Sequence, residues 1–170
     1  HLRDVTAEHL GLSRADFAKL LLQLPPRLTR AQVQASFNQM AGAERDRLER
    51  MFLSHDAPPG GYAVRDVILF GLSEMARARQ CLGLLKRNDA TALGRLMSRS
   101  HDGDRVSREN ARHKWKRRVA SVADEELVAW SMKTGAGGDI SELAGAYACS
   151  VPELDRIADL ATRLPGVEGA

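Results

Sequence analysis

Apolar residues in the first sixty positions recur at the spacing of amphipathic helices. Positions 17, 20, 21 and 24 are apolar and follow Ser13, which has Asp16 three residues on, as in a capping box. Thr29 and Gln32 form a second capping box ahead of another short helix. The inner faces of the second and third helices would be formed by Val33, Phe37, Met40, Leu48, Met51 and Phe52. We expect three short helices that pack together as a satellite bundle within residues 1–60.

The pattern changes at residue 62. The run 67–70 (VILF) would by itself fit a buried strand, but apolar positions continue at 75, 78, 82 and 85. Such sustained spacing predicts one long, mostly buried helix over 62–88. Asp89 then caps a short helix with Leu93, Leu96 and Met97 on its inner side.

The last third of the chain alternates turn-forming and helical sequence. Residues 101–104 (HDGD) are typical of a turn, and the basic segment 105–118 is interpreted as a helix. Carboxylates at 124–126 fit the first turn of a helix that carries Leu127, Trp130 and Met132. Ser150, with Glu153 three residues on, predicts the cap of a final helix. That helix would bury Leu154, Ile157, Ala158 and Ala161, and residues 167–170 would be left unattached. No stretch shows convincing alternation of period two, so the fold class expected is mainly α.

Composition narrows the class of protein. The chain has 170 residues, a formal net charge of +3, 28% charged and 44% hydrophobic residues. This is the profile of a soluble globular protein with enough chain for one domain. The longest apolar run, 67–72, is far too short to span a membrane. A charge of +3 does not by itself indicate a nucleic-acid partner.

The two cysteines, Cys81 and Cys149, lie far apart and form no CxxC motif. One disulfide is arithmetically allowed, but a pair of buried free thiols is favoured. No charged-then-apolar signal segment opens the sequence, so a cytoplasmic location is expected.

Three segments have residue types that bind ligands, and each also has a simpler interpretation. The glycine-rich loop 135–138 resembles a phosphate cradle, but no strand precedes it, so a turn between helices is favoured. Segment 105–118 has seven basic residues and Trp115, which indicates a solvated basic face or an anion-binding surface. Asp102 and Asp104, with Ser100 and His101 beside them, suit a hard metal or sugar hydroxyls, or else a plain turn. No Ser-His-Asp or Cys-His arrangement is apparent.

Several stretches also share a pattern with a known family. Residues 2–6 (LRDVT) open the chain, and residues 77–80 (RARQ), 84–89 (LLKRND) and 92–101 (ALGRLMSRSH) follow. Residues 147–155 (YACSVPELD) and 164–170 (LPGVEGA) then occur in the same order as in that family. Together these stretches resemble the carboxyl-terminal part of a galactokinase-type sugar kinase of the GHMP superfamily.

The resemblance implies a fold and an activity. The chain would be the helical part of an α+β carboxyl-terminal domain, with residues 62–100 and 147–170 as the family-like core. The complete protein would transfer the γ-phosphoryl group of ATP to a monosaccharide hydroxyl, commonly the anomeric one, with Mg²⁺. No catalytic residue is expected within these residues. The residues expected to line or support the sugar side are Ser100, His101, Asp102, Asp104 and Arg105.

Residues 106–140 depart from the family pattern and are interpreted as an insertion. The core is therefore expected to close without them, from the helices around 75–85, 93–97 and 154–161. Two alternatives stay open for the function. One is a non-catalytic helical interaction module, and the other is a helical domain that binds anions or nucleic acid through Arg105–Arg118.

Overall fold

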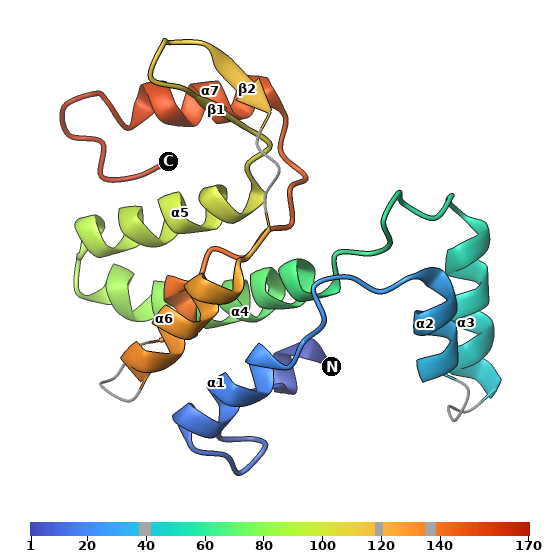
Figure 1. Ribbon diagram of the computed structural model, residues 1–170. Coiled ribbons are helices and arrows are strands. Elements are labelled where there is room, and N and C mark those ends of the chain that lie inside the picture. The colour runs from blue at the N-terminus through green and yellow to red at the C-terminus, as the bar shows by residue number, and fades with distance from the viewer. Residues whose placement is uncertain (38–41, 118–120, 135–138) are drawn as a thin grey trace.

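The computed structural model describes residues 1–37, 42–117, 121–134 and 139–170, and this part of the chain is mainly α-helical, as predicted (Figure 1). The helices are α1 (Arg14–Leu22), α2 (Arg30–Ser36), α3 (Gly42–Leu53), α4 (Val64–Lys86), α5 (Ala90–Asp104), α6 (Asp124–Thr134) and α7 (Pro152–Ala161). The shorter elements are the 3-10 helices η1 (Leu2–Asp4) and η2 (Ile140–Glu142) and the strands β1 (Ser107–Glu109) and β2 (Trp115–Arg117). Met40 and the glycine-rich loop 135–138 lie outside the described residues.

The long helix α4 is confirmed, and other segments are fastened to it by buried polar groups. The guanidinium of Arg77 donates to the backbone carbonyls of Ser141 at 2.8 Å and Leu143 at 2.7 Å. The carboxylate of Asp66 accepts the backbone amide of Val122 at 2.6 Å. Buried charged groups require such partners, so these bonds fix where the chain on both sides of α6 crosses α4.

The hydrophobic core lies where α1, α4 and α6 meet. Its buried members are Phe17, Ala18, Leu21, Leu69, Leu72, Val122, Leu127, Trp130 and Leu143. None of them belongs to 75–85, 93–97 or 154–161, and three come from the segment 106–140. The core is therefore not formed by the three helices expected, and the segment 106–140 contributes to it. Trp130 is buried because its indole ring packs in this core and its Nε1–H donates to the carbonyl of Asp139.

The satellite bundle contains fewer helices than expected. Helix α1 packs against α6 and belongs to the main core, because its buried side chains Phe17 and Leu21 face that core. Helices α2 and α3 lie apart from it, beside the amino-terminal end of α4 (Figure 1). Arg30 of α2, Phe52 of α3 and Tyr62, which precedes α4, form a small aromatic cluster. The Phe52 and Tyr62 rings stack at a centroid distance of 5.9 Å, and the Arg30 guanidinium lies 5.0 Å from the Phe52 centroid.

The basic segment is not a helix. Strands β1 and β2 pair antiparallel, with Ser107 opposite Arg117 and Glu109 opposite Trp115. The side chain of Asn110 stabilises the connecting turn by accepting the backbone amides of Arg112 at 2.9 Å and Lys114 at 3.1 Å. The helical interpretation is therefore wrong. Ser107 is buried and hydrogen-bonded to Asp155 of α7, whereas the basic side chains of the two strands are exposed.

Three of the four predicted helix caps are confirmed. Ser13, Thr29 and Asp89 each accept a backbone amide three residues on, with the reciprocal bond of a capping box at Thr29. The cap at Ser150 is wrong: α7 begins at Pro152, Val151 occupies the N-cap, and no side chain caps it. Proline is favoured at the first helical position because it has no amide hydrogen to satisfy.

Several apolar side chains expected inside are exposed. Leu154 and Ile157 on α7 are 55% and 61% exposed, because Asp155 and Ala158 form the inward face of that helix. The methionines expected in the core are also half exposed where described: Met51, Met75 and Met97. The carboxyl-terminal residues are attached to the molecule, since Gly94 in α5 lies against the backbone of Glu168 and Gly169.

Both cysteines are free thiols, as favoured, but Cys81 is half-buried and Cys149 is exposed, so the expectation of burial is wrong for both. Among the described residues, no helix combines the length and the apolar character needed to cross a membrane.

Candidate functional site

The predicted site residues lie at the carboxyl-terminal end of α5. They are Ser100, His101, Asp102 and Asp104 within the helix and Arg105 at its C-cap. Residues 101–104 therefore form the last helical turn, and the expectation of a separate turn is wrong. Because residues two apart on a helix do not share a face, Asp102 and Asp104 point to different partners. In the described part of the chain, no three His, Cys, Asp or Glu side chains are grouped so as to hold a metal ion.

Asp155 is the most buried charged group in this region and joins three elements. Its side chain is 0% exposed. Its Oδ2 accepts the backbone amides of Val106 at 3.0 Å and Ser107 at 2.7 Å and the hydroxyl of Ser107 at 2.9 Å. Its Oδ1 lies 3.3 Å from Nε2 of His101. Asp155 thus holds the start of β1 against α7, and its other carboxylate oxygen faces His101 at the end of α5.

The pKa of Asp155 reflects two opposing effects. Burial favours the neutral acid and by itself would raise the pKa. Hydrogen bonds from the Ser150 and Ser107 side chains and from the Ser107 and Val106 amides favour the carboxylate. The hydrogen bonds prevail, and the pKa of Asp155 lies below its ordinary value. The group is therefore a permanent buried anion at neutral pH.

A second set of charges surrounds Arg105. This side chain is buried, and its guanidinium lies 2.6 Å from a carboxylate oxygen of Asp159 in α7 and 3.5 Å from Asp102 in α5. Arg108 in β1 also bonds Asp102, at 2.8 Å. The network connects α5, α7 and the hairpin, so Arg105 and Asp102 are positioned by fixed partners.

Asp104 positions a different segment. Its side chain accepts the backbone amide of Cys149 at 2.8 Å, and its carbonyl accepts the amide of Ser150 at 3.0 Å. Nearby, the Tyr147 ring stacks on Phe70 at a centroid distance of 5.3 Å. These contacts fasten the extended chain before α7 to the end of α5.

A polar cavity opens between α5, α7 and the hairpin. It has a volume of about 290 Å³, and two of the predicted residues, Asp102 and Arg105, line it. Its other polar lining comes from Ser98, Arg108, Glu109, Asp159, Thr162 and Arg163. Hydroxyl, carboxylate and guanidinium groups side by side offer both donors and acceptors, which is what a polyhydroxylated ligand requires. Asp159 and Arg163 were not predicted as site residues, since the sequence did not reveal which face of α7, or which residues just after it, turn toward α5.

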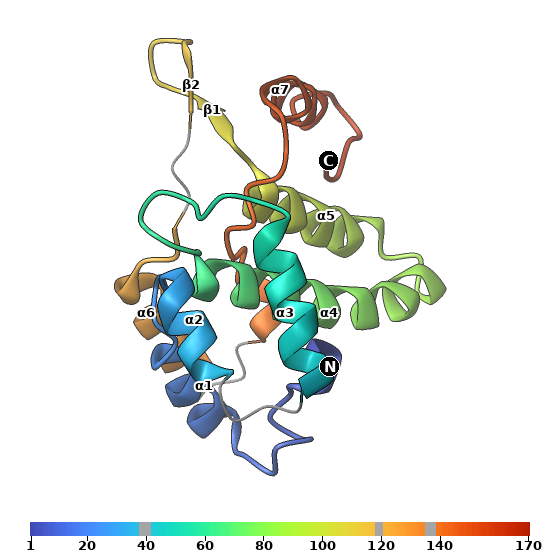
Figure 2. The same ribbon diagram turned by 90° about the vertical axis from the view of Figure 1, so that its right-hand side faces the viewer.

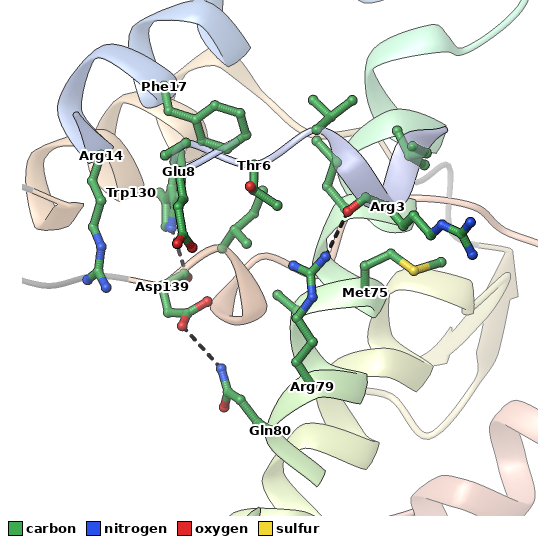
Figure 3. A pocket seen from close by; sticks show the side chains of 16 residues that line it. Arg3, Thr6, Glu8, Arg14, Phe17, Met75, Arg79, Gln80, Trp130 and Asp139 are labelled. Carbon is green, nitrogen blue, oxygen red and sulfur yellow. Dashed lines mark hydrogen bonds between the residues drawn. The ribbon is translucent and has the colours of Figure 1, made fainter. Parts of the chain in front are cut away.

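A second, larger cavity lies on the other side of α4 (Figure 3). Its volume is about 370 Å³, and it is enclosed by the amino-terminal segment, α1, α4, α6 and η2. Sequence reasoning missed it because its lining comes from three separated stretches, within positions 2–17, 72–80 and 130–140. No local motif marks such a site.

Comparisons with family models, with curated proteins and with solved structures found no match to this chain.

Proposed function

We propose that these residues form the helical part of an ATP-dependent sugar kinase of galactokinase type, and that the cavity between α5 and α7 contributes to sugar binding. The observation that supports this is the way the family-like stretches contact one another. His101, which ends the stretch 92–101, lies 3.3 Å from Asp155 in the stretch 147–155. Gly94 lies against Glu168 in the stretch 164–170. Residues that carry the resemblance thus contact one another where α5 meets α7 and the carboxyl-terminal segment.

The amino-terminal stretch is held in the same way. The guanidinium of Arg79 donates to the carbonyl of Arg3 at 2.7 Å, and Leu2 packs over Gly71 of α4. A resemblance carried by exposed residues without contacts would give weaker support, because such positions are free of structural constraint.

In this proposal, the described residues contribute to sugar binding and not to phosphoryl transfer. In a complete kinase, ATP supplies the phosphoryl group and Mg²⁺ neutralises its charge. The described residues present no cluster of metal ligands, and we assign neither ATP nor Mg²⁺ to them. Asp102 and Arg105, fixed by their partners, would orient sugar hydroxyls by accepting and donating hydrogen bonds.

The test is a coupled ADP-release assay on the polypeptide encoded by the complete reading frame that contains these residues. The substrates are ATP, Mg²⁺ and a panel of hexoses, pentoses and uronic acids. We expect one sugar to be phosphorylated, and Asp102→Asn to lower kcat/KM for it by about tenfold, or about 1.4 kcal/mol. Glu125→Gln, an exposed acid on α6, is the control and should change nothing. If no sugar in the panel is phosphorylated, the proposal fails.

The 170-residue chain alone should show no ATP-dependent phosphorylation in the same assay. The reason is that the sequence has no glycine-rich phosphate loop between a strand and a helix, the arrangement that would hold the phosphates of ATP. Phosphorylation of any sugar above background by the purified chain would contradict this expectation.

The second candidate function, anion or nucleic-acid binding, is supported by the hairpin. Arg112, Lys114, Lys116 and Arg117 are exposed and have no acidic partner in the described part of the chain. The acid beside them, Glu109, is bound to Arg163 at 2.6 Å, which lowers the pKa of Glu109. The hairpin projects at the edge of the molecule (Figure 2). A basic ribbon of this kind suits phosphate contacts, in place of the basic helix expected from the sequence.

A fluorescence-anisotropy titration with a labelled single-stranded oligonucleotide at several salt concentrations tests this alternative. If the hairpin contacts phosphates, the affinity should fall steeply with salt, and the Lys114→Gln, Lys116→Gln double variant should flatten the slope. Lys133→Gln, an exposed lysine on α6, is the matched control. Binding that ignores salt or the double variant would eliminate this candidate.

A further inference from the structure

The cavity beside α4 combines an apolar interior with a charged rim (Figure 3). Phe17 from α1, Leu72 from α4 and Trp130 from α6 form its inner wall, and each is at most 6% exposed overall. The volume of about 370 Å³ lies within the range of small-molecule sites, about 300–1,000 Å³. An aromatic and aliphatic wall of this kind suits the apolar body of a small ligand.

The rim carries more free positive than free negative charge. Three arginines line it, Arg3, Arg14 and Arg79, against two acids, Glu8 and Asp139. The carboxylate of Asp139 is already used, since it accepts the Gln80 amide at 3.1 Å and the Ser141 backbone amide at 2.9 Å. These donors are neutral, so Asp139 keeps its charge, and the rim has three guanidinium groups against two carboxylates. Arg3 also lies 3.9 Å from Asp4.

Two of these arginines are available to a ligand. The Arg14 side chain makes no hydrogen bond or ion pair within the described part of the chain, and it is one of the residues that line the cavity (Figure 3). Arg79 uses Nη2 to bond the carbonyl of Arg3 at 2.7 Å and keeps its other N–H groups. A guanidinium binds a carboxylate or phosphate in a directional, often bidentate, way.

We propose that this cavity binds a small organic anion that has a flat apolar body and a carboxylate-like head group. The body lies against Phe17, Leu72 and Trp130, and the head group accepts hydrogen bonds from Arg14 or Arg79 at the rim. The alternative, a cationic ligand, would have Glu8 and Asp139 as partners but would face three guanidinium groups. The proposal is independent of the sugar-kinase proposal, because it involves a different cavity and no residue of the α5–α7 junction.

The indole N–H of Trp130 gives a local readout. The chain has two tryptophans, so a ¹H–¹⁵N spectrum shows two indole signals, and Trp115→Phe assigns the one from the hairpin. The probe is 2-naphthoate, and its neutral counterpart 2-naphthamide tests the need for charge. We expect 2-naphthoate to shift the Trp130 signal saturably, and 2-naphthamide to bind about tenfold more weakly or worse.

Arg14→Gln tests the rim. This exposed residue is the first of α1, where a cation is electrostatically unfavourable, so its removal should not destabilise the fold. We expect the affinity for 2-naphthoate to fall by about three- to tenfold, with an unchanged thermal midpoint. Arg112→Gln in the hairpin turn is the matched control and should bind like the parent protein. The proposal is overturned if the Trp130 signal does not shift, if the amide binds as tightly as the acid, or if the Arg14 and Arg112 variants behave alike.

Discussion

At the scale of single residues, the buried carboxylate of Asp155 should make stability depend on pH. Because its folded-state pKa is lowered, its contribution to the unfolding free energy is complete above the ordinary aspartate pKa, about 3.9, and is lost as pH falls through the lower folded value. Asp155→Asn should cost about 2–3 kcal/mol at neutral pH. In urea melts, the deficit should shrink as the pH falls below about 3.9. Glu153→Gln, an exposed acid on the same helix, should show neither effect.

Two leucines at similar helical positions should differ sharply in what they contribute. Leu127 in α6 is 0% exposed, and Leu127→Ala should cost about 2–5 kcal/mol through lost burial and the cavity left behind. Leu154 in α7 is 55% exposed, and Leu154→Ala should change the unfolding free energy by less than about 0.5 kcal/mol. Urea denaturation of the two variants measures both. A larger loss at Leu154 would mean that its face of α7 is covered in solution.

At the scale of elements, local signals were sufficient for most helices and failed for the hairpin. The caps at Ser13, Thr29 and Asp89 depend on residues three positions apart, so the sequence displays them directly. Strand β1 is held by Asp155, nearly fifty positions away, and a contact that distant leaves no periodic trace. The turn chemistry at Asn110 was the one local signal for a hairpin, and the surrounding basic residues favoured a helix instead.

The attachment of the carboxyl-terminal segment to α5 should depend on Gly94. A Cβ at this position would overlap the backbone of Glu168, so Gly94→Ala should displace residues 164–170 although alanine is the better helix former. Gly83→Ala in α4 is the matched control: its Cβ would meet only the flexible Arg87 side chain, and it should stabilise the protein by up to about 1 kcal/mol. Amide hydrogen exchange at residues 164–170 distinguishes the two variants, because only Gly94→Ala should lower the protection there. Equal protection in both variants would contradict this packing.

At the scale of the whole molecule, the candidate site was partly predictable. Asp102 was singled out by residue type and Arg105 among the residues that the resemblance implies for the sugar side, and both line the polar cavity. Asp155 was noted only as part of a family-like stretch, because its burial and its partners depend on how α5, α7 and the hairpin assemble. The cavity enclosed by Phe17, Leu72 and Trp130 depends on the same kind of information, namely which distant segments meet at the core.

Because three core residues lie in the segment 106–140, we expect that its removal prevents cooperative folding. A deletion of 106–139, bridged by a short Gly/Ser linker, removes Val122, Leu127 and Trp130 from the core. It also removes the hydrogen bond that the Val122 amide donates to Asp66. Loop-closure entropy changes little with such a shortening, so the lost burial decides the outcome. We expect this variant to lack a cooperative thermal melt in circular dichroism.

A smaller deletion separates the hairpin from the core. Replacing 110–114 by Asn-Gly keeps the pairing of Ser107 with Arg117 and supplies a two-residue turn that suits antiparallel strands. Because the removed residues are intermediate or exposed and none belongs to the core, this variant should melt cooperatively within a few degrees of the parent protein. A cooperative melt of the large deletion would show that α6 is dispensable. Loss of cooperativity in the small one would show that the turn contributes to folding beyond its own strands.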